Sequence, residues 1–156
     1  MEHKYLWEGI CQGGWRAQSR FNADLYPEGV KGLSLGFQPQ ERRTSTLRGL
    51  DCEPVQVAGV ADHVHLLFGL SRTISLAELV KDLKTSSTKM MRDKGHRDFS
   101  WQTGYGAFSV SESNKSAVIE YIVNQETHHR EMTFQEEIRA LLKKHSMRFD
   151  ERYIWD

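Results

Sequence analysis

Two neighbouring segments carry the hydrophobic pattern of β-strands. In residues 53–60 (EPVQVAGV), valines alternate with more polar positions, as expected of a strand. Residues 63–70 (HVHLLFGL) are apolar nearly throughout, which predicts a second and largely buried strand. The letters ADH between the two apolar runs indicate a short connection or a bulge.

Apolar residues at helical spacing predict two helices with well-defined starts. In the first, Ser75 is a suitable N-cap, Glu78 completes a capping box, and Gly95 is a suitable C-terminal stop. In the second, Thr133 and Glu136 occupy the two box positions. The apolar stripe of the first helix consists of Leu76, Leu79, Val80, Leu83, Met90 and Met91, and that of the second of Phe134, Ile138, Leu141 and Leu142.

The pattern between and before these helices is less regular. Residues 106–112 (GAFSVSE) alternate well enough for a strand, and Ser113 or Asn114 can cap a further helix over residues 116–128. Residues 10–50 show neither period cleanly and are rich in Gly, Arg, Gln and Ser. A domain of this size rarely spends ~40 residues on an unstructured connection, so this is either a long irregular segment or a region that has lost its original pattern.

Composition narrows the class of protein. The 156 residues, 38% of them hydrophobic and 27% charged, with a formal net charge of zero, favour one soluble globular domain. No apolar run approaches the ~18 residues of a membrane span, and the start MEHKYLWEGI lacks signal-peptide features, so we expect a cytoplasmic protein. Cys11 and Cys52 stand far apart, which is typical of neither a disulfide framework nor a zinc site.

Positive charge gathers in residues 81–97. Six basic and two acidic residues (six minus two) give this segment a net charge of +4. Such a helix face could follow the phosphates of a nucleic acid, or it could be an ordinary solvated surface.

The histidines His63 and His65 lie on the same side of the second strand, because side chains alternate faces along a strand. They could converge on one metal ion, but an isolated pair is more often incidental and is an incomplete ligand set. Helical geometry brings Tyr121, Gln125 and His128 together beside the apolar stripe of their helix. A Gln carbonyl can bind a hard cation, and a tyrosine can be either a nucleophile or a packed core ring.

Three motifs in this order resemble those of the single-tyrosine HUH transposases, which act on single-stranded DNA, and of the related REP-associated tyrosine transposases. HVH (63–65) resembles the HUH motif, and YIVNQ (121–125) resembles the helix that carries the catalytic tyrosine. WQTGYGAFSVS (101–111) is similar to a recurrent stretch of insertion-sequence members. The resemblance covers about Gly49 to Trp155, roughly two thirds of the chain.

The resemblance implies an α+β, ferredoxin-like fold, an antiparallel sheet with helices packed on one face, in a homodimer. It implies an enzyme that cuts and rejoins hairpin-bearing single-stranded DNA through a 5′-phosphotyrosine intermediate, without a nucleotide cofactor, associated with the nucleoid when bound to DNA. Tyr121 would match the nucleophile, and His63, His65 and Gln125 the ligands of one Mg²⁺ or Mn²⁺. The tyrosine helix can complete the histidine pair of its own or of the partner subunit.

By the same resemblance, the basic helix corresponds to a segment with which members of the family contact DNA. The residues expected to bind DNA are therefore Lys81, Lys84, Ser86, Ser87, Lys89 and Arg92. Trp101, Tyr105 and Phe108 are candidates for stacking on bases, although packing in the core explains them at least as well. His128 and His129 could approach the phosphate or cap their helix.

Residues 10–48 depart from the family pattern. A strand begins in HKYLWEGI and stops, and the helix expected before LRGLDCEP is absent, since glycines and a proline stand in its place. We expect a single transposase domain over residues 1–156 with an atypical segment at 10–48, produced by two compensating frameshifts or by decay of an element copy. The alternatives to an active transposase are a domesticated relative that processes dispersed hairpin repeats, and a DNA-binding remnant that cannot cut.

Overall fold

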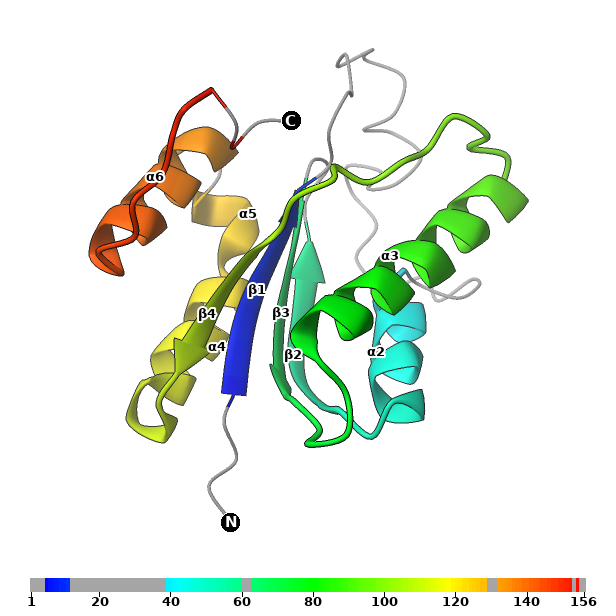
Figure 1. Ribbon diagram of the computed structural model, residues 1–156, viewed down its shortest axis with the longest axis horizontal. Helices are drawn as coiled ribbons and strands as arrows, with labels where there is room; N and C mark the ends of the chain where they lie inside the picture. Colours follow the sequence, from blue (N-terminus) through cyan, green and yellow to red (C-terminus); the bar gives the residue numbers. More distant parts are fainter. Residues whose placement is uncertain (1–4, 12–38, 60–62, 129–131, 153, 155–156) are drawn as a thin grey trace.

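A four-stranded antiparallel sheet forms the centre of the molecule, which is a computed structural model (Figure 1). It describes residues 5–11, 39–59, 63–128, 132–152 and 154. The strands are β1 (Tyr5–Cys11), β2 (Glu53–Gly59), β3 (His63–Gly69) and β4 (Gly106–Val110). The helices are α2 (Pro39–Gly49), α3 (Leu76–Asp93), α4 (Lys115–Val123), α5 (Gln125–His128) and α6 (Phe134–Lys144), and a 3-10 turn, η1 (Glu112–Asn114), precedes α4.

The described elements up to β4 follow the order β-α-β-β-α-β, and the strands lie side by side in the order β2-β3-β1-β4. β1 is thus central: Tyr5 pairs with Gly69 of β3 on one side and with Val110 of β4 on the other. This βαββαβ order is that of ferredoxin-like folds, and the predicted α+β class is confirmed.

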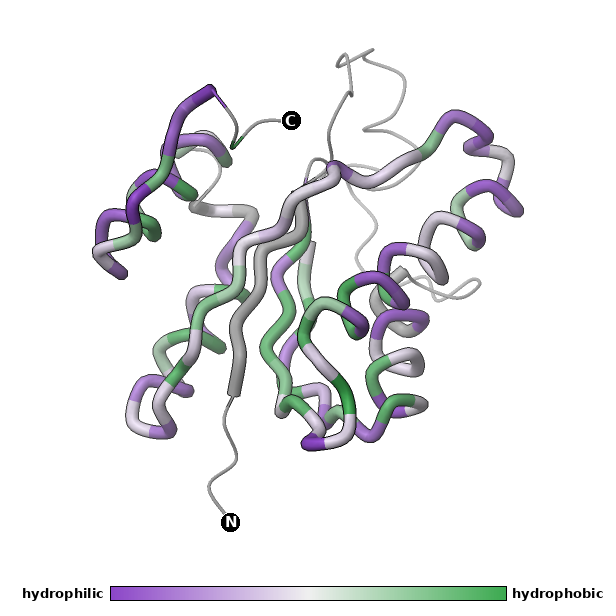
Figure 2. Tube along the Cα trace, viewed as in Figure 1, coloured by the Kyte–Doolittle hydropathy of each residue, from purple (hydrophilic) through white to green (hydrophobic). Residues whose placement is uncertain are grey.

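The strand β3 is buried along its whole length and divides its side chains between two hydrophobic clusters. Val64, Leu66 and Phe68 pack with residues of α2 and α3 on one face. Leu67 packs with Phe108 of β4 and with residues of α4 and α6 on the other face. Figure 2 shows hydrophobic positions along β3 and the neighbouring helices.

Helices therefore cover both faces of the sheet, and the prediction of helices on one face only is wrong. The reason is that β3 is apolar on both sides, so each side needs its own cover. α2 and α3 lie on one side of the sheet and α4 to α6 on the other (Figure 1).

α2 corrects the prediction that no helix precedes Leu47. Pro39 stands at the first residue of the helix, where its fixed φ and missing N–H are tolerated, and the glycines that argued against a helix precede it. Leu47 is fully buried in the core, and the guanidinium of Arg43 lies 5.5 Å from the centre of the Trp101 ring. Residues 12–38 of the atypical segment lie outside the described residues.

The other helices begin as the sequence predicts but do not all run as far. Both capping boxes are formed, by Ser75 with Glu78 at α3 and by Thr133 with Glu136 at α6. The helix predicted over residues 116–128 is interrupted at Asn124, which separates α4 from α5. Among the helices of the described residues, none combines the length and the hydrophobicity that a membrane crossing requires.

Candidate active site

His63 and His65 lie on the face of the sheet that α4 and α6 cover, as strand alternation predicts. Both side chains are buried, and their rings meet edge to face with centroids 4.9 Å apart. Phe134, at the start of α6, lies against the ring of His63 with the two centroids 4.6 Å apart. The histidine pair is therefore a packed part of the interface between β3 and α6.

Glu137 of α6 contacts both histidines. Its Oε2 lies 3.4 Å from Nε2 of His63, and its Oε1 lies 3.3 Å from Nε2 of His65. The residue is only 3% exposed. A glutamate buried between two imidazoles is costly unless these partners or a cation compensate its charge.

The sequence analysis missed Glu137, although one signal was available. Position 137 falls on the apolar stripe of its helix, three residues after Phe134 and four before Leu141. A carboxylate at a stripe position is unusual, but it stands in a charged run behind the capping Glu136, which hides it among surface residues.

Three side chains between β3 and α6 offer the ligand atoms of a metal site. One ligand atom each from His63, His65 and Glu137 can be chosen so that all lie within 4.8 Å of one another, and all three residues are buried. Two imidazole nitrogens and a carboxylate oxygen suit a divalent cation. The residues present therefore fit the metal that the resemblance implies.

Gln125, the first residue of α5, reaches the same place. Its Nε2 lies 2.7 Å from Nε2 of His63, and its buried Oε1 has no hydrogen-bond partner among the described residues. An amide oxygen in this position is a further ligand atom that could bind a cation. The structure thus brings the three predicted ligands together and adds Glu137 to them.

Tyr121 of α4 contacts the same group of residues. Its hydroxyl donates a hydrogen bond to Oε1 of Glu137, and its ring lies edge-on to His65 with centroids 5.9 Å apart. Burial, followed by the hydrogen bond and the charge of Glu137, raises the pKa of the Tyr121 phenol.

The pKa of Glu137 is shifted in the opposite direction. Burial acts to raise it, but hydrogen bonds from His65 and Tyr121 and the charges of the two histidines together lower it. Glu137 is therefore an ionised carboxylate, and the Tyr121 phenol that donates to it is neutral.

The predicted DNA-binding residues divide into two groups. Lys81, Lys89 and Arg92 are exposed on α3. α3 packs on the face of the sheet opposite to Tyr121.

The second group, Lys84, Ser86 and Ser87, makes hydrogen bonds within the protein. Lys84 Nζ donates to the carbonyls of residues 102, 103 and 104 at 2.9, 3.2 and 2.8 Å. Ser87 is buried; its Oγ donates to the Leu83 carbonyl at 2.6 Å and accepts from Nε1 of Trp101 at 2.8 Å. The prediction that the Ser87 hydroxyl contacts a phosphate is therefore corrected, since this hydroxyl makes hydrogen bonds inside the protein. Ser86 Oγ is bonded to the Leu83 carbonyl and to Thr46.

The aromatic candidates also differ from one another. Phe108 and Trp101 pack in the hydrophobic clusters, as the packing alternative expects. Tyr105 is 41% exposed, with Nζ of Lys84 at 5.7 Å from its ring centre. The His128 side chain and His129 lie outside the described residues.

A buried histidine pair on an inner strand of the antiparallel sheet thus faces a tyrosine on a helix that covers it. Residues 39–125 match the family model described as "Transposase IS200 like". The match spans more than half of the chain, and the chain belongs to the IS200-like transposase family. The match ends at Gln125, before α6 begins.

Solved structures with the same fold include two transposase relatives. One is a REP-associated tyrosine transposase bound to a REP hairpin, with a TM-score of 0.56, 11% identity, and coverage of 83% of this chain and 70% of that one. The other, from Deinococcus radiodurans R1, is assigned as a transposase, with a TM-score of 0.51, 20% identity, and coverage of 80% and 92%. A comparison with curated proteins found no match.

Proposed function

We propose that this transposase cuts and rejoins single-stranded DNA through a covalent link to Tyr121. The observation that carries the proposal is that one carboxylate, that of Glu137, contacts the Tyr121 hydroxyl and both histidines of the candidate metal set. A nucleophile and a cation site that contact the same carboxylate are close enough to act on one phosphate.

The reaction requires four changes at the phosphate. The phenolic oxygen of Tyr121 bonds to phosphorus, the bond to the 3′ oxygen of the preceding nucleotide breaks, and the phenol proton leaves while the 3′ oxygen gains one. The hydrogen bond from Tyr121 places a proton acceptor, Glu137, at the nucleophile. Reversal of these changes by another 3′-OH rejoins the strands without ATP, because the phosphotyrosine retains the energy of the phosphodiester.

His63, His65 and Glu137, with the amide oxygen of Gln125, would hold a Mg²⁺ or Mn²⁺ ion. When bound, such an ion polarises the scissile phosphate and offsets the charge that resists an anionic nucleophile. The chain's own contribution is to keep the two imidazoles facing one point, which the packing of Phe134 and Tyr121 against their rings supports.

The proposed substrate is DNA with a hairpin next to the cleaved strand. It is supported by the fold shared with a relative that was solved with a REP hairpin, and by the exposed cations of α3, which can bind phosphates. We also propose a homodimer, because β4 lies at an edge of the sheet that the described strands form, and a second copy could pair with its backbone groups.

The test is a cleavage assay with hairpin-bearing single-stranded DNA and Mn²⁺. We expect a covalent protein–DNA adduct on a denaturing gel, its loss in Tyr121→Phe, and its retention in Tyr105→Phe, which removes an exposed hydroxyl elsewhere. His63→Ala should abolish the adduct but largely spare DNA binding in a gel-shift assay. Adduct formation by His63→Ala would refute the metal role.

The same assay separates the alternatives. DNA binding by the unaltered protein without any adduct would identify a binding remnant. An adduct with scattered genomic hairpin repeats, and none with the ends of the surrounding element, would identify a domesticated relative.

A further inference from the structure

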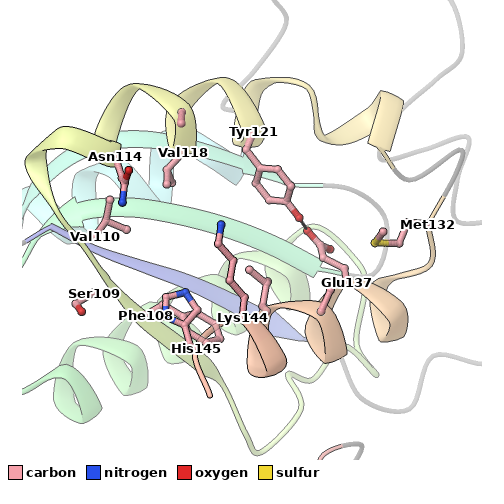
Figure 3. A pocket seen from close by; sticks show the side chains of 13 residues that line it. Phe108, Ser109, Val110, Asn114, Val118, Tyr121, Met132, Glu137, Lys144 and His145 are labelled. Carbon is pink, nitrogen blue, oxygen red and sulfur yellow. Dashed lines mark hydrogen bonds between the residues drawn. The ribbon is translucent and has the colours of Figure 1, made fainter. Parts of the chain in front are cut away.

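A cavity opens beside the nucleophile and is not explained by the cleavage step itself. It lies between β4, α4 and α6 and has a volume of about 550 Å³ (Figure 3). Tyr121 and Glu137 form part of its wall. Whatever enters it therefore lies next to the atoms that react.

Most of the cavity wall is apolar. It is lined by Val118 of α4, Leu141 of α6 and Val110 of β4. Phe108 and His145 also line it, and their rings pack against each other with centroids 4.6 Å apart and a 35° tilt between the planes. Apolar and aromatic walls of this kind suit a flat heterocycle rather than a charged group.

Two polar side chains complement these walls. Lys144 points into the cavity, and Asn114 lines it from the end of η1, just before α4 (Figure 3). The lysine supplies a cation for a phosphate, and the amide supplies a donor and an acceptor for a base edge. Glu137 carries the only acidic side chain among the lining residues of the described chain, and it is engaged with the histidines and Tyr121.

We propose that this cavity receives the base of a nucleotide that flanks the scissile phosphate, while Nζ of Lys144 binds the next phosphate along the strand. The inference rests on the proposed function and extends it to the choice of cleavage position. A phosphate held at Tyr121 has its neighbouring bases within one nucleotide of it, and the cavity is an apolar space that has Tyr121 in its own wall.

The first test replaces bases one at a time. An abasic residue is placed at each position around the cleavage site of the hairpin substrate, and adduct yield and Kd are measured. We expect one flanking position at which loss of the base weakens binding by about tenfold, and much smaller effects elsewhere. Equal effects at all positions would overturn the proposal.

Variants then link that position to the cavity. Ala117→Trp fills the cavity from α4 and should abolish the difference between the abasic and intact substrates, whereas Ala77→Trp on α3 should preserve it. Lys144→Ala should weaken binding and lower the slope of log Kd against log salt by about one, whereas its exposed neighbour Lys143 can be changed to Ala without this loss.

The outcomes separate this inference from the proposed function. An adduct that is insensitive to every abasic position and to Ala117→Trp would remove the base site and leave the nuclease intact. If no substrate gives an adduct, the proposed function fails. The base site can still be tested by binding, with 2-aminopurine placed at each position of the DNA and its fluorescence measured. A change in oligomeric mass in Ala117→Trp without any change in base dependence would assign the cavity to a second copy of the chain.

Discussion

At the scale of single residues, Glu137 is the side chain on which the site depends. It contacts His63, His65 and Tyr121, which lie on two other elements. If α6 were displaced, the histidines and the tyrosine would lose the group that connects them.

Glu137→Gln preserves the size of this side chain and removes its charge. We expect the affinity of the DNA-free protein for Mn²⁺, measured by calorimetry, to fall by at least about tenfold. Glu120→Gln, at an exposed position of α4, is the matched control and should bind Mn²⁺ normally. Unchanged affinity in Glu137→Gln would instead favour the set of His63, His65 and Gln125 that the sequence predicts.

The residues found from sequence are those whose pattern is local. The alternation of a strand places His63 and His65 together, and helical spacing places Gln125 near Tyr121. Glu137 joins them only because α6 folds back over β3, and no periodicity within either segment predicts that contact.

At the scale of elements, capping signals predicted where helices begin, whereas the search for amphipathic patterns did not find every helix. Ser75 and Thr133 start α3 and α6 as predicted, because a capping box is a contact between residues three apart. α2 was missed because few of its residues are apolar, and contacts with distant residues such as Trp101 hold it. Tertiary packing outweighs weak helix propensity in such a case.

Thr133→Ala removes the cap of the helix that carries Glu137. We expect a loss of about 1 kcal/mol in the free energy of unfolding, measured by urea titration. Thr85→Ala is the control, since that exposed hydroxyl donates to the Lys81 carbonyl within α3 and should change stability by a few tenths of a kcal/mol. Equal losses in the two variants would contradict the role of the cap.

The pH dependence of this cap follows from the same contacts. Hydrogen bonds from the backbone and side chain of Thr133 lower the pKa of Glu136 below its ordinary value of 4.5. A group whose pKa is depressed by folding stabilises the folded state above its ordinary pKa, and this contribution is lost as the pH falls through the lowered value. The cap of α6 is thus complete near neutral pH.

At the scale of the whole molecule, the sheet separates two layers of helices. The candidate active site and the cavity lie with α4 and α6, and the exposed cations of α3 lie with α2 on the other side. One DNA molecule that contacts both must therefore pass around an edge of the sheet.

Leu47→Ala tests whether α2 belongs to the folded core. Truncation of this fully buried side chain should cost about 2–5 kcal/mol in the free energy of unfolding. Ser45→Ala on the exposed side of the same helix should stay within about 0.5 kcal/mol. A small effect of Leu47→Ala would support a decayed segment that contributes little to the fold.

The central place of β1 also has a consequence for biosynthesis. β2 and β3 are adjacent in the chain and can pair as a hairpin soon after both leave the ribosome. β1 is made first, but its partners are the later strands β3 and β4, reached at residues 63 and 106. The first strand of the nascent chain must therefore wait for its second neighbour, and the sheet closes only when most of the polypeptide has been synthesised.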